Sequence, residues 1–139
     1  MIKTVLSIDD DKVTQLLNKF HLNANKFCTN VIETYNGLEA IDFFKKLDSG
    51  EVSMESFPEI IFLDLNMPVM EGWEFFEAFK RDFAKFEAKT KIFILSSSIN
   101  PADIERAKNE RSIIAFLAKP LNAENLKKVI HFLGLNENI

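Results

Sequence analysis

The chain has 139 residues, 47% of them hydrophobic, which is enough for one globular domain to bury a core without disulfides or a structural metal. Its 21 acidic and 17 basic residues form no basic stripe, which argues against direct binding of nucleic acid. The only cysteine, Cys28, excludes an internal disulfide and a cysteine-based zinc site. No leader-like or membrane-length apolar run is present, so we expect a cytoplasmic protein that contacts no membrane.

Apolar runs typical of buried strands alternate with segments that have helical spacing. We predict strands at 3–8, 30–35, 60–63, 91–95 and 113–117. We predict helices at 12–26, 38–47, 73–86, from 101 onward, and at 124–133. In the first helix the apolar residues Val13, Leu16, Leu17 and Phe20 are spaced as on one face. The 14 Phe residues indicate a core packed largely with phenylalanine.

Five strands and five helices in strict alternation predict an α/β fold with a parallel sheet between two helical layers. The expected architecture is a flavodoxin-like three-layer sandwich of strand order 2-1-3-4-5. We expect one domain over residues 1–139, with a core from about 3 to 133. In this order the first and third strands are neighbours, so Asp9, Asp10 and Asp64 should converge at one edge of the sheet.

The strand at 60–63 ends in Asp64, and Pro68 and Gly72 then interrupt the backbone before the next helix. Ligands of open α/β sheets bind outside the carboxyl ends of the strands, which is where Asp64 should lie. A third acid after the first strand, Asp11, is either a solvated member of the group or the cap of the following helix.

Three carboxylates at close range require a cation or a raised pKa. Oxygen ligands favour Mg²⁺, Mn²⁺ or Ca²⁺, and Mg²⁺ characteristically shares carboxylates with a phosphate oxygen. Lys119 follows the fifth strand and Ser96 ends the fourth, so both should reach the same edge. A carboxylate nucleophile with Mg²⁺, an ammonium and a hydroxyl is suited to phosphoryl transfer that forms an aspartyl phosphate.

These residues resemble the receiver domain of two-component response regulators over almost the whole chain. The resemblance is carried by Asp9-Asp10-Asp11, by the run from Asp64 to Gly72, by Ser96-Ser97 and by Lys119-Pro120. It implies that Asp64 is the phosphoacceptor. It also implies a Mg²⁺ site formed by Asp64, by Asp10 as a direct ligand, by Asp9 acting largely through water, and by the backbone carbonyl of Asn66.

The resemblance further implies that Lys119 contacts the phosphoryl group and that Ser96 and Phe116 are the switch residues. Two positions depart from the family pattern. Phe116 lacks the phenolic hydroxyl that is common there, so an inward state must be stabilised by packing alone. Ser97 stands where alanine is usual. Neither departure removes a group that phosphorylation needs.

By this resemblance we expect a stand-alone receiver phosphorylated by a histidine kinase or a histidine phosphotransfer protein. It would be a signalling phosphoacceptor and would turn over no external substrate. Phosphorylation would change the surface formed by the helix from Pro101, the strand at 113–117 and the helix at 124–133. A downstream effector protein would bind there, and the receiver would be a monomer or a phosphorylation-dependent dimer.

Three other classes of protein fit the sequence less well. A pseudo-receiver, which acts as an interaction module without phosphorylation, generally lacks one of the acids or the lysine, and this chain has them all. A phosphatase of the haloacid dehalogenase type would need a second acid two residues after its nucleophile, where Asn66 stands. A flavodoxin would need a Ser/Thr-rich phosphate loop after the first strand, where this chain has three acids.

Overall fold

In a computed structural model, which describes residues 2–134, the five strands form one parallel sheet of order β2-β1-β3-β4-β5. The strands are β1 (Ile2–Ile8), β2 (Cys28–Thr34), β3 (Ile60–Leu63), β4 (Lys91–Ser96) and β5 (Ile113–Ala118). The predicted flavodoxin-like order is therefore confirmed. Residue 1 and residues 135–139 of the predicted domain lie outside the described part of the chain.

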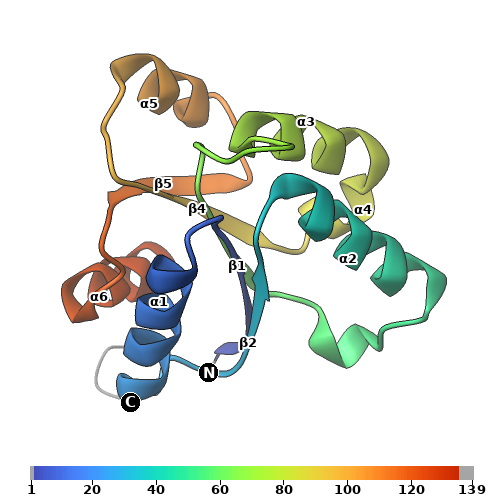
Figure 1. The fold of residues 1–139 in the computed structure, drawn as a ribbon, viewed down its shortest axis with the longest axis horizontal. Coiled ribbons are helices and arrows are strands. Elements are labelled where there is room, and N and C mark those ends of the chain that lie inside the picture. Colours follow the sequence, from blue (N-terminus) through green and yellow to red (C-terminus); the bar gives the residue numbers. More distant parts are fainter. Residues whose placement is uncertain (1, 135–139) are drawn as a thin grey trace.

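The helices are α1 (Lys12–Ala24), α2 (Gly37–Ser49), α3 (Gly72–Asp82), α4 (Ala84–Glu87), α5 (Pro101–Lys108) and α6 (Ala123–Phe132), with a short 3₁₀ helix η1 (Met54–Ser56). Helices α1 and α6 cover one face of the sheet, and α2 to α5 cover the other (Figure 1). Each face has its own apolar core cluster, so the sheet is buried on both sides. No helix within residues 2–134 is long and apolar enough to cross a membrane.

The single helix predicted at 73–86 is wrong, because the structure divides it into α3 and α4 at Phe83. The backbone of Phe83 leaves the helical region there, with φ −133° and ψ 41°. The break lets Phe83 and Phe86 turn into the same core, where their rings stack with centroids 6.0 Å apart. Burial of two aromatic side chains outweighs the loss of helix continuity at one residue. The structure therefore has six α-helices in the described residues instead of the predicted five.

Phe44 lies at the centre of the core between the sheet and helices α2 and α3. It is fully buried, and its ring centroid lies 4.6 Å from that of Phe79. The rings of Phe75, Phe83 and Phe86 lie within 6.4 Å of it as well. This cluster confirms the prediction of a core packed with phenylalanine.

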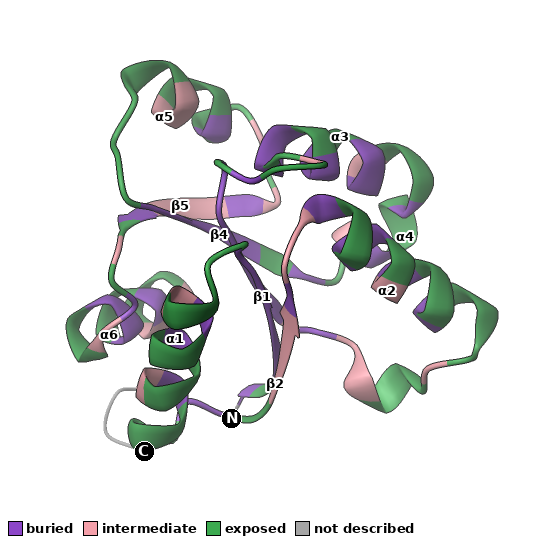
Figure 2. Cartoon of the chain, in the orientation of Figure 1, coloured by how far each residue is buried: buried purple, intermediate pink, exposed green. Residues whose placement is uncertain are grey.

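Helix α1 is oriented opposite to the usual arrangement, in which the apolar stripe faces the core. Its apolar residues Val13, Leu16, Leu17 and Phe20 are exposed, whereas Gln15 and Asn18 are buried together with Leu22. Figure 2 shows α1 with exposed residues along most of its length. The Gln15 side-chain amide donates hydrogen bonds to three backbone carbonyls, of Ser7, Asp9 and Thr34, at 3.0, 3.1 and 2.9 Å. These bonds tie α1 to the ends of β1 and β2, so the polar side must face inward.

We therefore expect Gln15→Leu to lower the free energy of unfolding by about 2 kcal/mol, although it makes the helix more apolar. Leucine would take this donor from the buried carbonyl oxygens, although the Thr34 carbonyl still accepts from the Asp9 N–H. Each buried polar group left without a partner costs about 1–3 kcal/mol. Leu16→Gln, on the exposed side, should change stability by less than about 0.5 kcal/mol. Urea denaturation followed by circular dichroism measures both. A destabilised Leu16→Gln with an unaffected Gln15→Leu would show that the helix is oriented the other way.

Candidate functional site

The ends of β1 and β3 bring three carboxylates together. Ile8 pairs with Leu63 in the register of these two strands, so Asp9 and Asp64, the next residues, emerge side by side. Asp9, Asp10 and Asp64 each offer a carboxylate oxygen, and the three oxygens lie within 4.8 Å of one another. Asp9 and Asp64 are buried, and Asp10 is exposed. The predicted convergence is confirmed.

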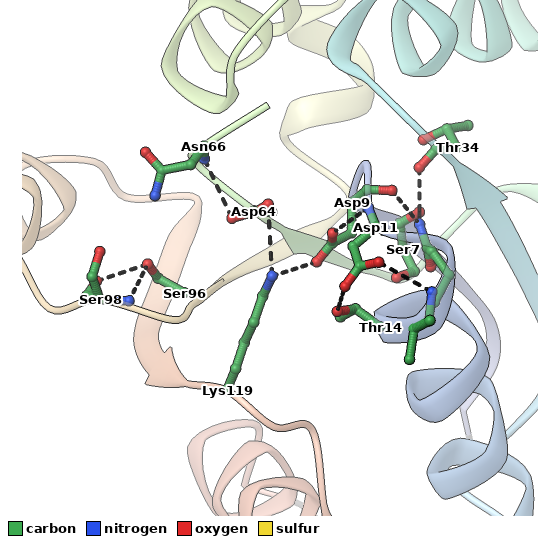
Figure 3. Close-up of polar contacts among 12 residues, drawn as sticks. Ser7, Asp9, Asp11, Thr14, Thr34, Asp64, Asn66, Ser96, Ser98 and Lys119 are labelled. Carbon is green, nitrogen blue, oxygen red and sulfur yellow. Dashed lines mark hydrogen bonds and ion pairs between the residues drawn. The ribbon is translucent and has the colours of Figure 1, made fainter. Parts of the chain in front are cut away.

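Lys119 reaches this cluster from the end of β5 (Figure 3). Its ammonium Nζ lies 2.6 Å from Asp9 Oδ2 and 3.6 Å from Asp64 Oδ2. The backbone around it is also held, because the Lys119 N–H donates to the Ser96 carbonyl at 2.8 Å. The Asn125 side chain on α6 donates to the carbonyls of Ala118 and Pro120, at 2.7 and 2.6 Å. Asn125 and Gln15 hold the site's backbone, and no motif in the sequence pointed to either.

The charges at this edge do not balance. When all are ionised, three carboxylates and one ammonium leave two net negative charges. Burial, followed by repulsion from Asp9, raises the pKa of Asp64 to about 6, although Lys119 partly opposes the rise. Burial by itself would lower the pKa of Lys119, but its ion pairs with Asp9 and Asp64 raise it above the ordinary value. Oxygen ligands in this number and with this charge fit a hard divalent cation such as Mg²⁺.

Asp11 is the cap of α1, which decides between its two predicted roles. Its carboxylate accepts hydrogen bonds from the Thr14 hydroxyl at 2.7 Å and from the Val13 N–H at 3.2 Å. These bonds lower the pKa of Asp11 below its ordinary value. The Asp11 N–H in turn donates to Asp9 Oδ1 at 3.0 Å, which orients the Asp9 carboxylate toward the site.

The loop after β3 is folded tightly beneath Asp64. The Asn66 N–H donates to Asp64 Oδ1 at 3.3 Å. A Cβ atom on Gly72 would lie 2.6 Å from the Asp64 carbonyl oxygen and 2.7 Å from the Leu65 Cα, so only glycine fits at the start of α3. The Asn66 carbonyl follows Asp64 in this loop, and its role as a Mg²⁺ ligand stays a prediction.

The two predicted switch residues, Ser96 and Phe116, lie near the site, but their side chains contact other groups. Ser96 is buried at the end of β4, and its hydroxyl donates to the Ser98 carbonyl at 2.7 Å (Figure 3). Phe116 is partly buried and packs against the core cluster on the side of α2 and α3. Their parts in a switch stay predictions.

Comparisons with known proteins agree with this geometry. Residues 5–131 match the response regulator receiver domain family. Response regulator Rcp1 of Synechocystis is 27% identical over 128 residues, which cover 92% of this chain and 84% of Rcp1. The nitrate/nitrite response regulator NarL of Escherichia coli K12 is 28% identical over 136 residues, or 98% of this chain. The chain spans 56% of the length of NarL.

The crystal structure of a two-component response regulator from Cytophaga hutchinsonii superposes on this fold with a TM-score of 0.84. The two sequences are 30% identical, and the match covers 96% of this chain and 98% of the other. The Mn²⁺-bound form of Rcp1 shares the fold, with a TM-score of 0.72 at 23% identity. With the family match over most of its length and the acid cluster at the expected strand ends, this chain belongs to the response regulator receiver domain family.

Proposed function

We propose that the protein accepts a phosphoryl group on Asp64 in a Mg²⁺-dependent reaction. The observation that carries this proposal is the position of the Asp64 carboxylate, which is buried beside two further carboxylates and 3.6 Å from the Lys119 ammonium. The donor would be a phosphorylated histidine of a histidine kinase or a histidine phosphotransfer protein. In this role the protein is a signalling phosphoacceptor of the cytoplasm and turns over no external substrate.

Asp9, Asp10, Asp64 and the Asn66 carbonyl would hold the metal, which neutralises charge on the phosphoryl oxygens when bound. A carboxylate oxygen of Asp64 attacks phosphorus in line, so that a P–O bond forms as the P–N bond to the donor imidazole breaks. The imidazole keeps the bonding electron pair and takes up a proton. With a pKa of about 6, Asp64 is ionised at neutral pH and needs no base to activate it. The Lys119 ammonium stabilises the negative charge that develops on the phosphoryl group.

The phosphoryl group would also draw the Ser96 hydroxyl away from the Ser98 carbonyl. Phe116 would then move inward into the space that Ser96 leaves. Both residues adjoin the surface formed by α5, β5 and α6. The rearrangement would therefore shift the equilibrium between two conformations of this surface, at which an effector or a second receiver binds. The outcome is either a monomer that binds an effector or a phosphorylation-dependent dimer.

Intact-protein mass spectrometry after incubation with acetyl phosphate and Mg²⁺ tests the proposal. We expect one phosphoryl adduct that requires Mg²⁺ and is absent from Asp64→Asn. Asp11→Asn is the matched control, because its carboxylate is exposed and engaged as a helix cap. This control should still form the adduct.

A folded protein without an adduct would instead favour the alternative of a pseudo-receiver that acts as an interaction module. An adduct that survives in Asp64→Asn would mean that another residue is the acceptor.

A further inference from the structure

Gln15 on α1 is only 1% exposed, and its side-chain amide donates hydrogen bonds to three backbone carbonyls. Two of these carbonyls belong to Ser7 and Asp9, around the end of β1, and the third belongs to Thr34, the last residue of β2. The three residues lie beside the start of α1 (Figure 3). Every acceptor of this amide is therefore at the edge of the sheet that carries the acid cluster.

The surroundings of the Gln15 amide allow it one orientation. Its Nε2 lies 2.9, 3.0 and 3.1 Å from the three carbonyl oxygens, whereas its Oε1 is buried and has no hydrogen-bond partner within residues 2–134. An amide turned over would place Oε1 against three other acceptors, and none of them can donate to it. Gln15 therefore acts here as a hydrogen-bond donor only.

Both backbone polar groups of Asp9 belong to this set of hydrogen bonds. The Asp9 N–H donates to the Thr34 carbonyl at 3.1 Å, and the Asp9 carbonyl accepts from Gln15 at 3.1 Å. The two carboxylate oxygens have partners as well, because Oδ1 accepts from the Asp11 N–H and Oδ2 pairs with the Lys119 ammonium. Each of the four polar atoms of Asp9 is thus held, and Gln15 is the side chain that holds the carbonyl.

The direction of Asp10 depends on the same hydrogen bond. The Asp9 carbonyl and the Asp10 N–H belong to one planar peptide group. A hydrogen bond to that carbonyl therefore fixes the plane from which the backbone of Asp10 continues. Asp10 is exposed, so packing does little to direct its side chain. The bond from Gln15 consequently orients the backbone of both acids that follow β1.

We propose that Gln15 is a positioning residue of the cation site, which holds the backbone of Asp9 and Asp10 so that their carboxylates are in place before the cation binds. This inference rests on the proposed function, in which a divalent cation binds among Asp9, Asp10 and Asp64. Loss of a group that orients metal ligands commonly weakens metal binding by about 10–100-fold. A side chain that only anchored α1 would contribute to stability and leave the metal affinity unchanged.

The test is a Mg²⁺ titration of isotope-labelled protein without a phosphodonor, followed by NMR amide shifts of residues 9–11 and 64–66. Gln15→Met keeps the length of the side chain and removes its donor, and it should raise the Kd for Mg²⁺ about tenfold. The matched control is Asn18→Leu, which replaces a buried amide three residues further along α1 whose nitrogen has no hydrogen-bond partner within residues 2–134. Its Kd should stay within about twofold of the wild-type value, because Asn18 holds no ligand's backbone.

A second readout separates metal affinity from the transfer step. The rate of adduct formation from acetyl phosphate in Gln15→Met should require more Mg²⁺, and at saturating Mg²⁺ it should return to within about threefold of the wild-type rate. The reason is that Gln15 contacts backbone carbonyls and not Asp64. Urea denaturation under the same conditions establishes that each variant is folded. If Gln15→Met does not fold, Gln15→Asn takes its place, because an amide shorter by one methylene cannot reach all three carbonyls and should weaken Mg²⁺ binding too.

A folded Gln15→Met protein that binds Mg²⁺ as tightly as the wild type would overturn the proposal and leave Gln15 as an anchor of α1 alone. An equal loss of affinity in Asn18→Leu would also overturn it, since both variants would then report a general loosening of the helix. The Kd comparison needs no phosphodonor, so it decides the role of Gln15 even if Asp64 forms no adduct. A wild-type protein that binds no Mg²⁺ would overturn this inference and the proposed function together.

Discussion

Lys119→Met is expected to slow phosphoryl transfer from acetyl phosphate to Asp64 by roughly 10²–10³-fold while it tightens Mg²⁺ binding. The Lys119 ammonium lies 2.6 Å from Asp9 and 3.6 Å from Asp64, close enough to stabilise charge on a group bound between them. Loss of one preorganised donor to a transition-state oxygen costs about this much in rate. The same ammonium competes with a cation for the carboxylates. Its removal leaves one more negative charge at the site, so Mg²⁺ should bind at least about tenfold more tightly.

Opposite changes in rate and metal affinity distinguish this role from a loss of fold. The rate is measured by intact mass at saturating Mg²⁺, and metal affinity by titration of the Trp73 fluorescence. Trp73 is the only tryptophan and is buried at the start of α3. Lys91→Met, an exposed lysine at the start of β4, serves as the control and should change neither quantity. A variant that binds Mg²⁺ more weakly and phosphorylates at the wild-type rate would contradict the assignment of Lys119.

In metal-free solution, Asp64→Asn should stabilise the protein by about 2 kcal/mol at pH 7.5. The pKa of Asp64 is raised from 3.8 to about 6 in the folded protein, mainly by burial and by Asp9. Between these two pKa values the folded state binds more protons than the unfolded state does. Stability from this group is therefore fully present below about pH 4 and is lost as pH rises to about 6. Asparagine keeps the uncharged form at every pH, so the variant avoids this loss.

The measurement is urea denaturation of both proteins in a chelator from pH 3.5 to 7.5. The difference in unfolding free energy should be small at pH 3.5, where Asp64 is protonated in the folded state and mostly protonated in the unfolded state, and should grow through pH 6. Added Mg²⁺ should then stabilise the wild type more than the variant, because a ligand stabilises the state that binds it. A pH-independent difference, or a variant less stable than the wild type at pH 7.5, would contradict the raised pKa.

Apolar runs and chain order were enough to predict the sheet and the acidic end of the site. Strands β3 and β4 are continuous apolar runs that suit burial on both faces. Their positions and their parallel pairing could therefore be predicted from the sequence. Given the strand order, parallel strands end at one edge, and the residues after β1 and β3 must meet there. The convergence of Asp9, Asp10 and Asp64 followed from chain order and needed no knowledge of side-chain packing.

Contacts between segments far apart in the sequence set which side of each helix faces the core and which hydrogen-bond partners its polar groups have. The spacing of α1 showed that the helix is amphipathic. Its orientation depends on the hydrogen bonds from Gln15 to three backbone carbonyls, which hold the side with Gln15 against the sheet and leave the apolar stripe exposed. The break at Phe83 depended on the packing of the Phe83 and Phe86 rings against Phe44 of α2. The same holds between α3 and α5, where the Trp73 indole N–H donates to Asp103 at 3.0 Å and the Arg106 guanidinium lies 4.2 Å from the indole ring. The periodicity of a sequence gives only the spacing of residues along one helix. The orientation of a helix, the position of a break and the partner of a polar side chain depend on residues from other segments, which periodicity does not contain.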